Sequence, residues 1–321
     1  MLTKLHESAQ TYIRPEYFFF AAVFLSLLFV LTPEEEMLSR QEAAAGESVR
    51  LLENPYDALE LIAKAAYVYD SREKKSLFEK DAHELLPLAS ITKIMTAFTA
   101  LSLIPETTYI SIDEEAIREE GDSGFMVGER WLLRDLLTYM LLESSNDGAA
   151  AVSSAIGEIF EGSGMDEKEY KARFVAEMNA LAMRSGLLET YFLNESGLDI
   201  GEAKAGAYST AAEAAELLRL ALEKFPDLFT ETRLSELVLE NEEGQRRAAR
   251  NTNTNLTEVP LLMASKTGYT DLAGGNLVIA FDAGFNRPII ISVLGSTMDG
   301  RFTDAEKLVW ATLEALGQNS E

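Results

Sequence analysis

The sequence predicts an α/β protein in which one antiparallel sheet is backed by terminal helices and carries an inserted all-helical lobe. Short β-branched or apolar segments lie near both ends of the chain, and nearly every segment from Ala89 to about Lys224 has helical spacing. A last amphipathic segment runs from about Asp304 to Leu316. Strands at both ends with helices between them are typical of a sheet that two distant parts of a chain build together.

The expected elements follow along the chain. Ala65–Asp70 and Ser76–Phe78 flank the polar turn Ser71–Lys75 and predict a β-hairpin. The helical lobe is predicted where apolar residues recur three and four positions apart. Its helices are expected at Ile91–Leu103, Leu132–Leu142, Gly148–Ile159, Glu167–Arg184 and Thr210–Leu222. Short strands bounded by Gly, Asn and Pro then follow, at Leu234–Glu240, Asn276–Asp282 and Pro288–Leu294.

The composition excludes several classes of function. The chain has 53 acidic and 28 basic side chains, a formal net charge of −25. Such a surface, without a basic stripe, repels phosphate backbones, so nucleic acid is not an expected partner. Cysteine is absent, which excludes thiol catalysis, disulfides and thiolate metal sites. The two histidines, His6 and His83, exclude a His-rich metal centre, and we expect His83 to be solvated in a polar hairpin.

The N-terminus carries a targeting segment. Tyr17–Leu31 is an unbroken apolar run with basic residues before it and acidic residues after it. Because positive charge stays on the cytoplasmic side, we expect an uncleaved signal anchor with most of the protein outside the cytoplasmic membrane. We therefore predict a cytoplasmic stub and anchor at 1–32, an acidic linker at 33–60, and a domain at 61–318 that holds the motifs described next.

The first motif is Ser90-Ile91-Thr92-Lys93, which opens an apolar helix. Residues three apart share a helix face, so Lys93 is expected beside the Ser90 hydroxyl. Lysine can take the proton of a nucleophilic serine if burial and nearby positive charge lower its pKa. The alternative is a plain N-cap serine with a surface lysine. A second Ser-x-x-Lys, from Ser71 to Lys74, lies on a turn that we expect to be solvated.

The second motif is Ser144-Ser145-Asn146, which lies between two predicted helices. One interpretation places a hydroxyl and an amide in a cleft. There the hydroxyl relays a proton to a leaving amine and the amide holds the substrate backbone. The other interpretation is structural, because Ser, Asn and Asp are preferred in loops that cap the next helix.

The third motif is Lys266-Thr267-Gly268-Tyr269-Thr270, on a stretch with the pattern of an edge strand. An edge strand beside a nucleophile can pair with an extended peptide substrate. Lys266 and Thr267 can hold a terminal carboxylate, and Gly268 lets the backbone come close. Taken alone, the motif is also compatible with a surface lysine that starts a turn.

As an ordered set, these motifs resemble those of the serine D-alanyl-D-alanine carboxypeptidases, the low-molecular-weight penicillin-binding proteins of the peptidase S11 type. The resemblance covers roughly Ala65 to Leu316. Besides the three motifs, it includes Phe192–Asp199, Tyr208–Ala211, Asn251–Asn253 and Leu294–Thr297. It implies the β-lactamase/transpeptidase-like α/β fold, which agrees with the strand–helix–strand order.

The resemblance also implies how the reaction proceeds. Ser90 attacks the carbonyl between the two terminal D-alanines of a peptidoglycan stem peptide, with Lys93 as general base. Ser144 assists proton transfer, and the backbone amides of Ser90 and Tyr269 form the oxyanion hole. Free D-alanine leaves, and water hydrolyses the acyl-enzyme.

For the substrate, the resemblance implies that Asn146 positions the peptide and that Lys266 with Thr267 binds its terminal carboxylate, beside Gly268 and Tyr269. β-Lactam antibiotics are the implied covalent inhibitors. No metal or organic cofactor is implied.

Two departures from the family pattern and three rival functions accompany this interpretation. Glu195 stands where many relatives have Pro, and Ser145 where many have Gly. A β-lactamase is disfavoured because its Glu-x-x-x-Asn spacing fails by one residue between Glu189 and Asn194. A D,D-endopeptidase would use the same site with different loops. A non-catalytic wall-binding protein would take no covalent label from penicillin.

Overall fold

The computed structural model describes residues 54–121, 123–162, 164 and 166–318, which belong to one compact unit beginning at Asn54. The predicted anchor at 1–32 and most of the predicted linker lie outside the described residues. Within the part of the chain that the structure describes, no helix combines the length and the apolar character needed to cross a bilayer.

A five-stranded antiparallel sheet joins the two ends of this unit. Its strand order is β10-β11-β12-β1-β2. In β1, which comes early in the chain, Val68 lies opposite Ile291 in β12, which comes late. The predicted hairpin and the predicted strands at Asn276–Asp282 and Pro288–Leu294 are therefore confirmed as parts of one sheet, whereas the predicted strand at Leu234–Glu240 lies in a separate two-stranded sheet. The strands are β1 (Ala65–Asp70), β2 (Lys75–Lys80), β10 (Leu262–Thr270), β11 (Gly274–Asp282) and β12 (Pro288–Ser296).

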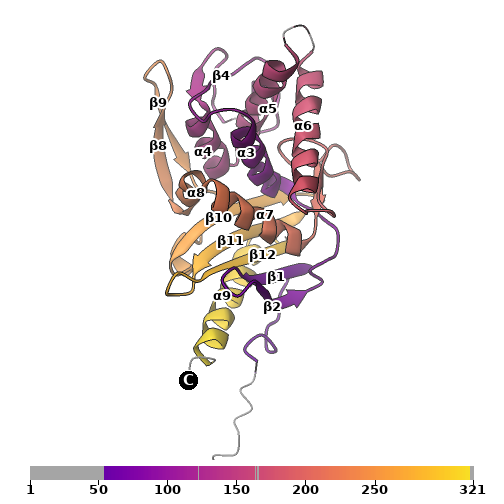
Figure 1. Ribbon diagram of the computed structural model, residues 1–321, viewed down its shortest axis with the longest axis vertical. Coiled ribbons are helices and arrows are strands. Elements are labelled where there is room, and N and C mark those ends of the chain that lie inside the picture. The colour runs from indigo at the N-terminus through magenta and orange to yellow at the C-terminus, as the bar shows by residue number, and fades with distance from the viewer. Residues whose placement is uncertain (1–53, 122, 163, 165, 319–321) are drawn as a thin grey trace, which may run out of the picture. The chain divides into compact units, whose positions relative to one another are not determined.

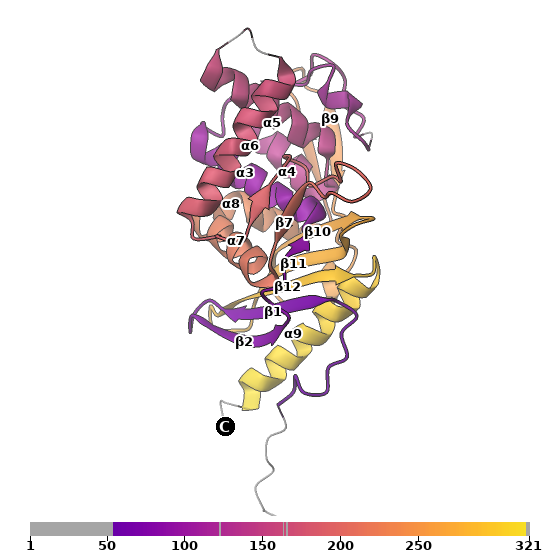
Figure 2. The same cartoon turned by 90° about the vertical axis from the view of Figure 1, so that its right-hand side faces the viewer.

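Both faces of this sheet are buried. Successive strand residues point to opposite faces, so Val278 on β11 joins the core shared with the helical lobe, whereas Ile279 joins a second core beneath α9 (Gly300–Gln318). The other covering helix is α7 (Ala211–Lys224), on the lobe side (Figure 1, Figure 2). The predicted C-terminal backing helix is confirmed. α7 does not belong to the lobe alone, because its apolar stripe packs on the sheet.

The helical lobe is built around α3 (Thr92–Leu103), which follows the 3-10 turn η1 (Ala89–Ile91). Every residue of α3 from Thr92 to Ala100 is buried, because four helices contact it. The predicted helices are confirmed, with ends that shift by no more than two residues. The other confirmed helices of the lobe are α4 (Leu133–Glu143), α5 (Asn146–Glu161) and α6 (Glu167–Arg184). The short α8 (Pro226–Phe229) follows α7 and was not predicted.

Short strands outside the five-stranded sheet form three small sheets, and most of these strands carry no sequence pattern of their own. A second hairpin pairs β8 (Glu236–Glu240) with β9 (Arg246–Arg250) beside α4 (Figure 1). The sequence predicts β8 but not β9, because RRAAR lacks alternating apolar residues. The remaining strands are β3 (Leu86–Pro87), β4 (Tyr109–Ser111), β5 (Arg130–Leu132), β6 (Tyr191–Phe192) and β7 (Ala207–Ser209).

Candidate active site

Ser90 lies in η1, where the chain passes from the sheet side into the lobe. The Asn276 amide on β11 donates to the carbonyl oxygens of Pro87 and Leu88 at 2.9 and 3.0 Å, which fixes the segment before the serine. Ala89 has φ 48°, a left-handed conformation that an L-residue holds only where its surroundings impose it. The serine is therefore presented by a strained and firmly anchored turn.

Lys93 is fully buried one helical turn after Ser90. Its Nζ lies 3.0 Å from Ser90 Oγ, 2.7 Å from Asn146 Oδ1 and 2.8 Å from the carbonyl oxygen of Ser196. A neutral amine has two N–H bonds and one lone pair. The N–H bonds can donate to Asn146 and Ser196 while the lone pair accepts the hydroxyl proton of Ser90.

The surroundings of Lys93 also favour its neutral form. Burial lowers the pKa of Lys93 to about 7, although the negative charges of Glu195 and Glu119 act in the opposite direction. The amine is thus well populated at neutral pH, where an exposed lysine would be almost entirely charged. Position and basicity together suit Lys93 to the role of general base that the sequence predicts.

In the second motif, one residue caps a helix and the other two face the site. Ser145 is the N-cap of α5 and accepts from the backbone amide of Gly148 at 2.9 Å, so the capping interpretation applies to this serine. Ser144, with φ 61°, ends α4, and its Oγ accepts from Lys266 Nζ at 2.9 Å. Asn146 faces Lys93 instead. The loop thus caps a helix and brings two polar side chains into the site.

The third motif lies on β10, at one edge of the five-stranded sheet, as predicted. Lys266 is buried, and its Nζ donates to Ser144 Oγ and to the carbonyl oxygen of Thr267 at 2.8 Å. The hydroxyls of Thr267 and Thr252 lie 2.5 Å apart. Tyr269 is 44% exposed, so the strand leaves the buried site toward solvent at this residue.

Gly268 is where the sheet comes closest to the serine. A Cβ built at Gly268 would lie 2.9 Å from the carbonyl oxygen of Leu88 and 3.1 Å from the backbone nitrogen of Ser90. Any larger residue would push β10 away from the serine. The glycine therefore lets the backbone amides at the start of the helix and on the edge strand approach each other.

Three buried basic side chains, those of Lys93, Lys266 and Arg301, converge at this site. Burial and the positive charges of Lys93 and Arg301 hold the pKa of Lys266 well below its usual range. Arg301 itself is 7% exposed and donates to the carbonyl oxygen of Gly268 at 2.8 Å. An anionic ligand bound here would favour the charged forms of these side chains and offset their mutual repulsion.

Arg301, Asn276 and Thr252 are site residues to which the sequence analysis assigns no role. The sequence offers one indication for Arg301, because this residue is a cation in the first turn of a helix, where the helix dipole disfavours positive charge. Asn276 is a polar residue in an otherwise apolar strand. Their partners lie far away in the sequence, so neither signal identifies what the side chain contacts.

The loop between β6 and β7 closes the site on the other side of Ser90. Gly197 has φ 84°, and a Cβ on it would lie 1.9 Å from the carbonyl oxygen of Ala89. Asn194 spans the loop, since its Oδ1 accepts from the Gly197 amide at 2.7 Å and its Nδ2 donates to Leu198 O at 2.9 Å. Glu189 is exposed, so its carboxylate is not buried in this site.

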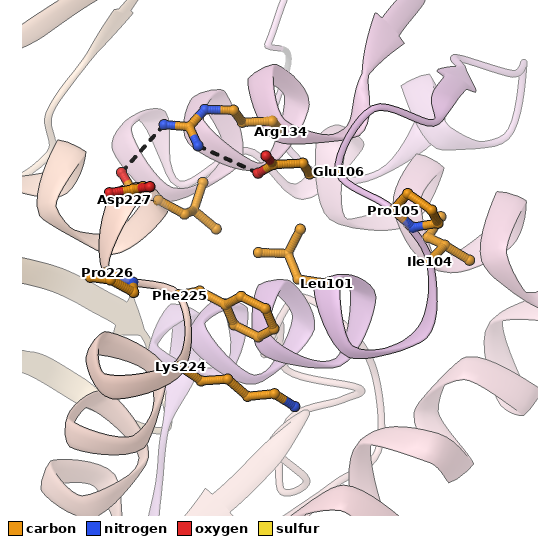
Figure 3. A pocket seen from close by; sticks show the side chains of 10 residues that line it. Leu101, Ile104, Pro105, Glu106, Arg134, Lys224, Phe225, Pro226 and Asp227 are labelled. Atoms are coloured by element: carbon orange, nitrogen blue, oxygen red, sulfur yellow. Dashed lines mark hydrogen bonds and ion pairs between the residues drawn. The ribbon is translucent and has the colours of Figure 1, made fainter.

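A separate pocket of about 330 Å³ lies at the C-terminal ends of α3 and α7 (Figure 3). Leu101 and Phe225 point into it, and Arg134 forms an ion pair with Glu106 at 3.4 Å. None of the predicted site residues lines it. Ser90 precedes the opposite end of α3, and a helix of that length separates its ends by roughly 18 Å.

The two weaker candidates from the sequence lie apart from this site. Lys74, in the second Ser-x-x-Lys, is exposed in the turn between β1 and β2. His83 is exposed in the connection between β2 and β3, as expected.

The chain is similar to known proteins in sequence and in fold. A family model described as D-alanyl-D-alanine carboxypeptidase matches residues 52–298. The chain is 28% identical over 253 residues to the D-alanyl-D-alanine carboxypeptidase DacF of Bacillus subtilis, covering 77% of this chain and 61% of DacF. It is 30% identical over 225 residues to a D-alanyl-D-alanine endopeptidase of Pseudomonas aeruginosa, covering 68% and 67%.

A solved structure with the same fold supports this similarity. Penicillin-binding protein D2 of Listeria monocytogenes, in its ampicillin-bound form, is 27% identical and superposes with a TM-score of 0.62. The match covers 79% of this chain and 98% of that structure. The predicted α/β fold, with its antiparallel sheet and helical lobe, is therefore confirmed.

Proposed function

The chain belongs to the D-alanyl-D-alanine carboxypeptidase family, and on that premise we propose that it removes the terminal D-alanine from peptidoglycan stem peptides. The observation that carries the proposal is the contact between Lys93 Nζ and Ser90 Oγ at 3.0 Å, with the lysine fully buried. A hydroxyl beside a buried amine is the arrangement that a serine acyl transferase without a catalytic histidine needs.

In the proposed reaction, Ser90 Oγ attacks the penultimate D-alanine carbonyl while Lys93 takes the hydroxyl proton. The oxyanion forms near the backbone amides of Ser90 and Tyr269, which the close approach of Gly268 supports. The C–N bond then breaks. Ser144, hydrogen-bonded to Lys266, passes a proton to the departing amine and regains one as the proton that Lys93 took from Ser90 moves on, so that both groups end the step as they began it. Water finally cleaves the ester and restores the serine.

The cationic side of the site suits a peptide that ends in a carboxylate. Lys266 and Arg301 are buried beside Thr267, whose hydroxyl pairs with that of Thr252. A C-terminal carboxylate there would accept charge-assisted hydrogen bonds from these donors. The edge position of β10 leaves room for the peptide backbone to pair with the strand. β-Lactams, which carry a carboxylate and a reactive amide, are the proposed covalent inhibitors.

Product analysis tests this proposal. The full chain, incubated with a purified muropeptide that ends in D-Ala-D-Ala, is expected to release one free D-alanine and leave the shortened peptide. Mass spectrometry of the peptide and an assay for free D-alanine measure both products. Release of neither product, together with no covalent adduct from benzylpenicillin, would contradict the proposal and favour a wall-binding protein without catalysis.

A D,D-endopeptidase is the second candidate, supported by the 30% identity to the Pseudomonas aeruginosa endopeptidase. The two functions share the serine chemistry and differ in the peptide that the site accepts. Cross-linked muropeptide dimers separate them, because an endopeptidase converts dimers to monomers without releasing D-alanine. A β-lactamase would instead turn over nitrocefin rapidly.

We also propose that the Tyr17–Leu31 segment anchors the protein with its catalytic domain outside the cytoplasmic membrane. The proposal is supported by the unbroken apolar run and by the basic residues before it. Protease added to intact spheroplasts is expected to digest the domain, and intact mass is expected to show the segment still attached. A domain that is protected until the membrane is opened would contradict this topology.

A further inference from the structure

A partly buried ion cluster lies outside the residues assigned to the reaction. Lys171 on α6 has its Nζ 2.7 Å from Glu119 Oε1, 3.1 Å from Glu167 Oε1 and 3.9 Å from Glu195 Oε1. The side chain of Lys171 is 17% exposed and that of Glu195 only 5%. One ammonium thus faces carboxylates from α6 itself, from the loop after η2 (Ala116–Arg118) and from the loop between β6 and β7.

The loop after η2 reaches the active site through its backbone. Glu120 follows Glu119 directly, and its carbonyl oxygen accepts from Asn146 Nδ2 at 2.6 Å. The other end of the Asn146 amide accepts from Lys93 at 2.7 Å. The position of this one carbonyl therefore sets the rotation of the Asn146 side chain. The ion pair between Glu119 and Lys171 is well placed to hold this carbonyl in position.

The loop between β6 and β7 reaches the site in the same way. Thr96 Oγ1 on α3 donates to the carbonyl oxygen of Glu195 at 2.6 Å, and Lys93 Nζ donates to that of Ser196 at 2.8 Å. These two bonds fix the loop backbone along α3. The Glu195 carboxylate is left buried beside Lys171.

Charge also connects the cluster to the reacting lysine. Burial raises the pKa of Glu195, and the positive charge of Lys171 acts in the opposite direction. The negative charges of Glu195 and Glu119 each raise the pKa of Lys93 against the effect of burial. Lys266 on β10 is also close enough to interact with Lys93 electrostatically, since the positive charge of Lys93 lowers the pKa of Lys266. The two acidic residues that act on Lys93, Glu119 and Glu195, are thus the ones that form ion pairs with Lys171.

We propose that Lys171 is a positioning residue for the acyl transfer. Its ammonium joins the two loops whose carbonyl oxygens orient Asn146 and Lys93, and it places the Glu195 carboxylate near Lys93. Glu195 then tunes the basicity of that lysine without touching the substrate. The inference rests on the proposed function, because it assumes that Ser90 is acylated.

The first test compares Lys171→Met with Lys168→Met in the full chain. Lys168 is exposed on the same helix and has no ion pair among the described contacts. Loss of the bridging cation is expected to slow acylation of Ser90 by benzylpenicillin by roughly tenfold or more, since small misplacements of reacting groups have effects of this size. Lys168→Met is expected to react like the wild type. Lys171→Arg is expected to recover most of the rate, because it keeps the charge.

The second test measures the midpoint pH of acylation, which would not change if Glu195 only held the fold together. The acylation rate rises with pH as Lys93 loses its proton, and Glu195→Gln is expected to move this midpoint to lower pH. The reason is that removing a nearby negative charge makes the ammonium less favourable. Glu189→Gln removes the same charge from an exposed position and is expected to leave the midpoint in place. The melting temperature of each variant is measured by circular dichroism, and all assays are run below it, so that every variant is folded when its rate is measured.

The outcomes separate the inference from the proposed function. A wild-type chain that takes no adduct overturns the proposed function itself. If the wild type is acylated and Lys171→Met reacts as fast as Lys168→Met, the positioning role is overturned. Should Lys171→Met not fold, a folded Lys171→Arg that fails to keep most of the wild-type rate overturns it instead, because that variant retains the bridging charge. If Glu195→Gln and Glu189→Gln have the same midpoint pH, the proposed effect of the Glu195 charge on the basicity of Lys93 is overturned.

Discussion

Replacing Ser90 with alanine is expected to abolish covalent labelling by benzylpenicillin and to lower stem-peptide hydrolysis by roughly 10⁴- to 10⁶-fold. The physical reason is that Lys93 Nζ lies 3.0 Å from Ser90 Oγ, and alanine leaves this base without a nucleophile to activate. Intact-mass spectrometry after incubation measures the result. The wild type is expected to gain a single adduct and the variant none.

A matched control for this experiment comes from the second Ser-x-x-Lys of the chain. Ser71→Ala removes the corresponding hydroxyl in the turn between β1 and β2, where Lys74 is exposed. We expect this variant to be labelled as the wild type is. An adduct that survives in Ser90→Ala, or disappears in Ser71→Ala, would place the nucleophile elsewhere and contradict the proposed reaction.

Replacing Lys93 with methionine is expected to slow acylation by roughly 10²- to 10⁴-fold, the usual contribution of a general base. In the wild type the rate should rise with pH through a midpoint near the pKa of about 7 that burial gives Lys93, because only the amine accepts the hydroxyl proton. Below that pH the ammonium dominates and acylation falls. The variant is expected to lose this rise, which a stopped-flow or fluorescent-penicillin assay across pH measures.

Lys74→Met is the control for this second experiment, since it removes the exposed lysine of the second motif. It is expected to keep both the rate and the pH dependence of the wild type. A Lys93→Met variant that retains the rise through neutral pH would show that another group takes the proton. Lys266, whose pKa is also lowered by burial, is the group to examine in that case.

Local patterns in the sequence were sufficient for most of the secondary structure. α6 has the predicted bounds, because Asp166 and Glu169 form a capping box that fixes its start. β9 was not predicted, because its residues RRAAR carry no alternation and it forms only by pairing with β8. The role of α7 was not predicted in full, because an amphipathic pattern shows that a helix has a buried face but not which surface covers that face.

The candidate site was predicted residue by residue, but its contacts were not. Ser90 and Lys93 are three apart on one helix, so their proximity follows from helical geometry alone. Ser144 and Lys266 are 122 positions apart, and only the folded chain brings them within 2.9 Å. Arg301 had no predicted role, because its contact with Gly268 depends on where the first turn of α9 lies relative to β10.

The sequence by itself determined the order of strands and helices, the three motifs and the serine–lysine pair, because each depends on residues within a few turns of one another. The tertiary structure decided which distant residues meet and how deeply they are buried. Burial is what lowers the pKa of Lys93 toward neutrality, and it results from helices and strands packing around that side chain from all sides. No local pattern contains that information, because the loss of solvent depends on every element that surrounds the residue.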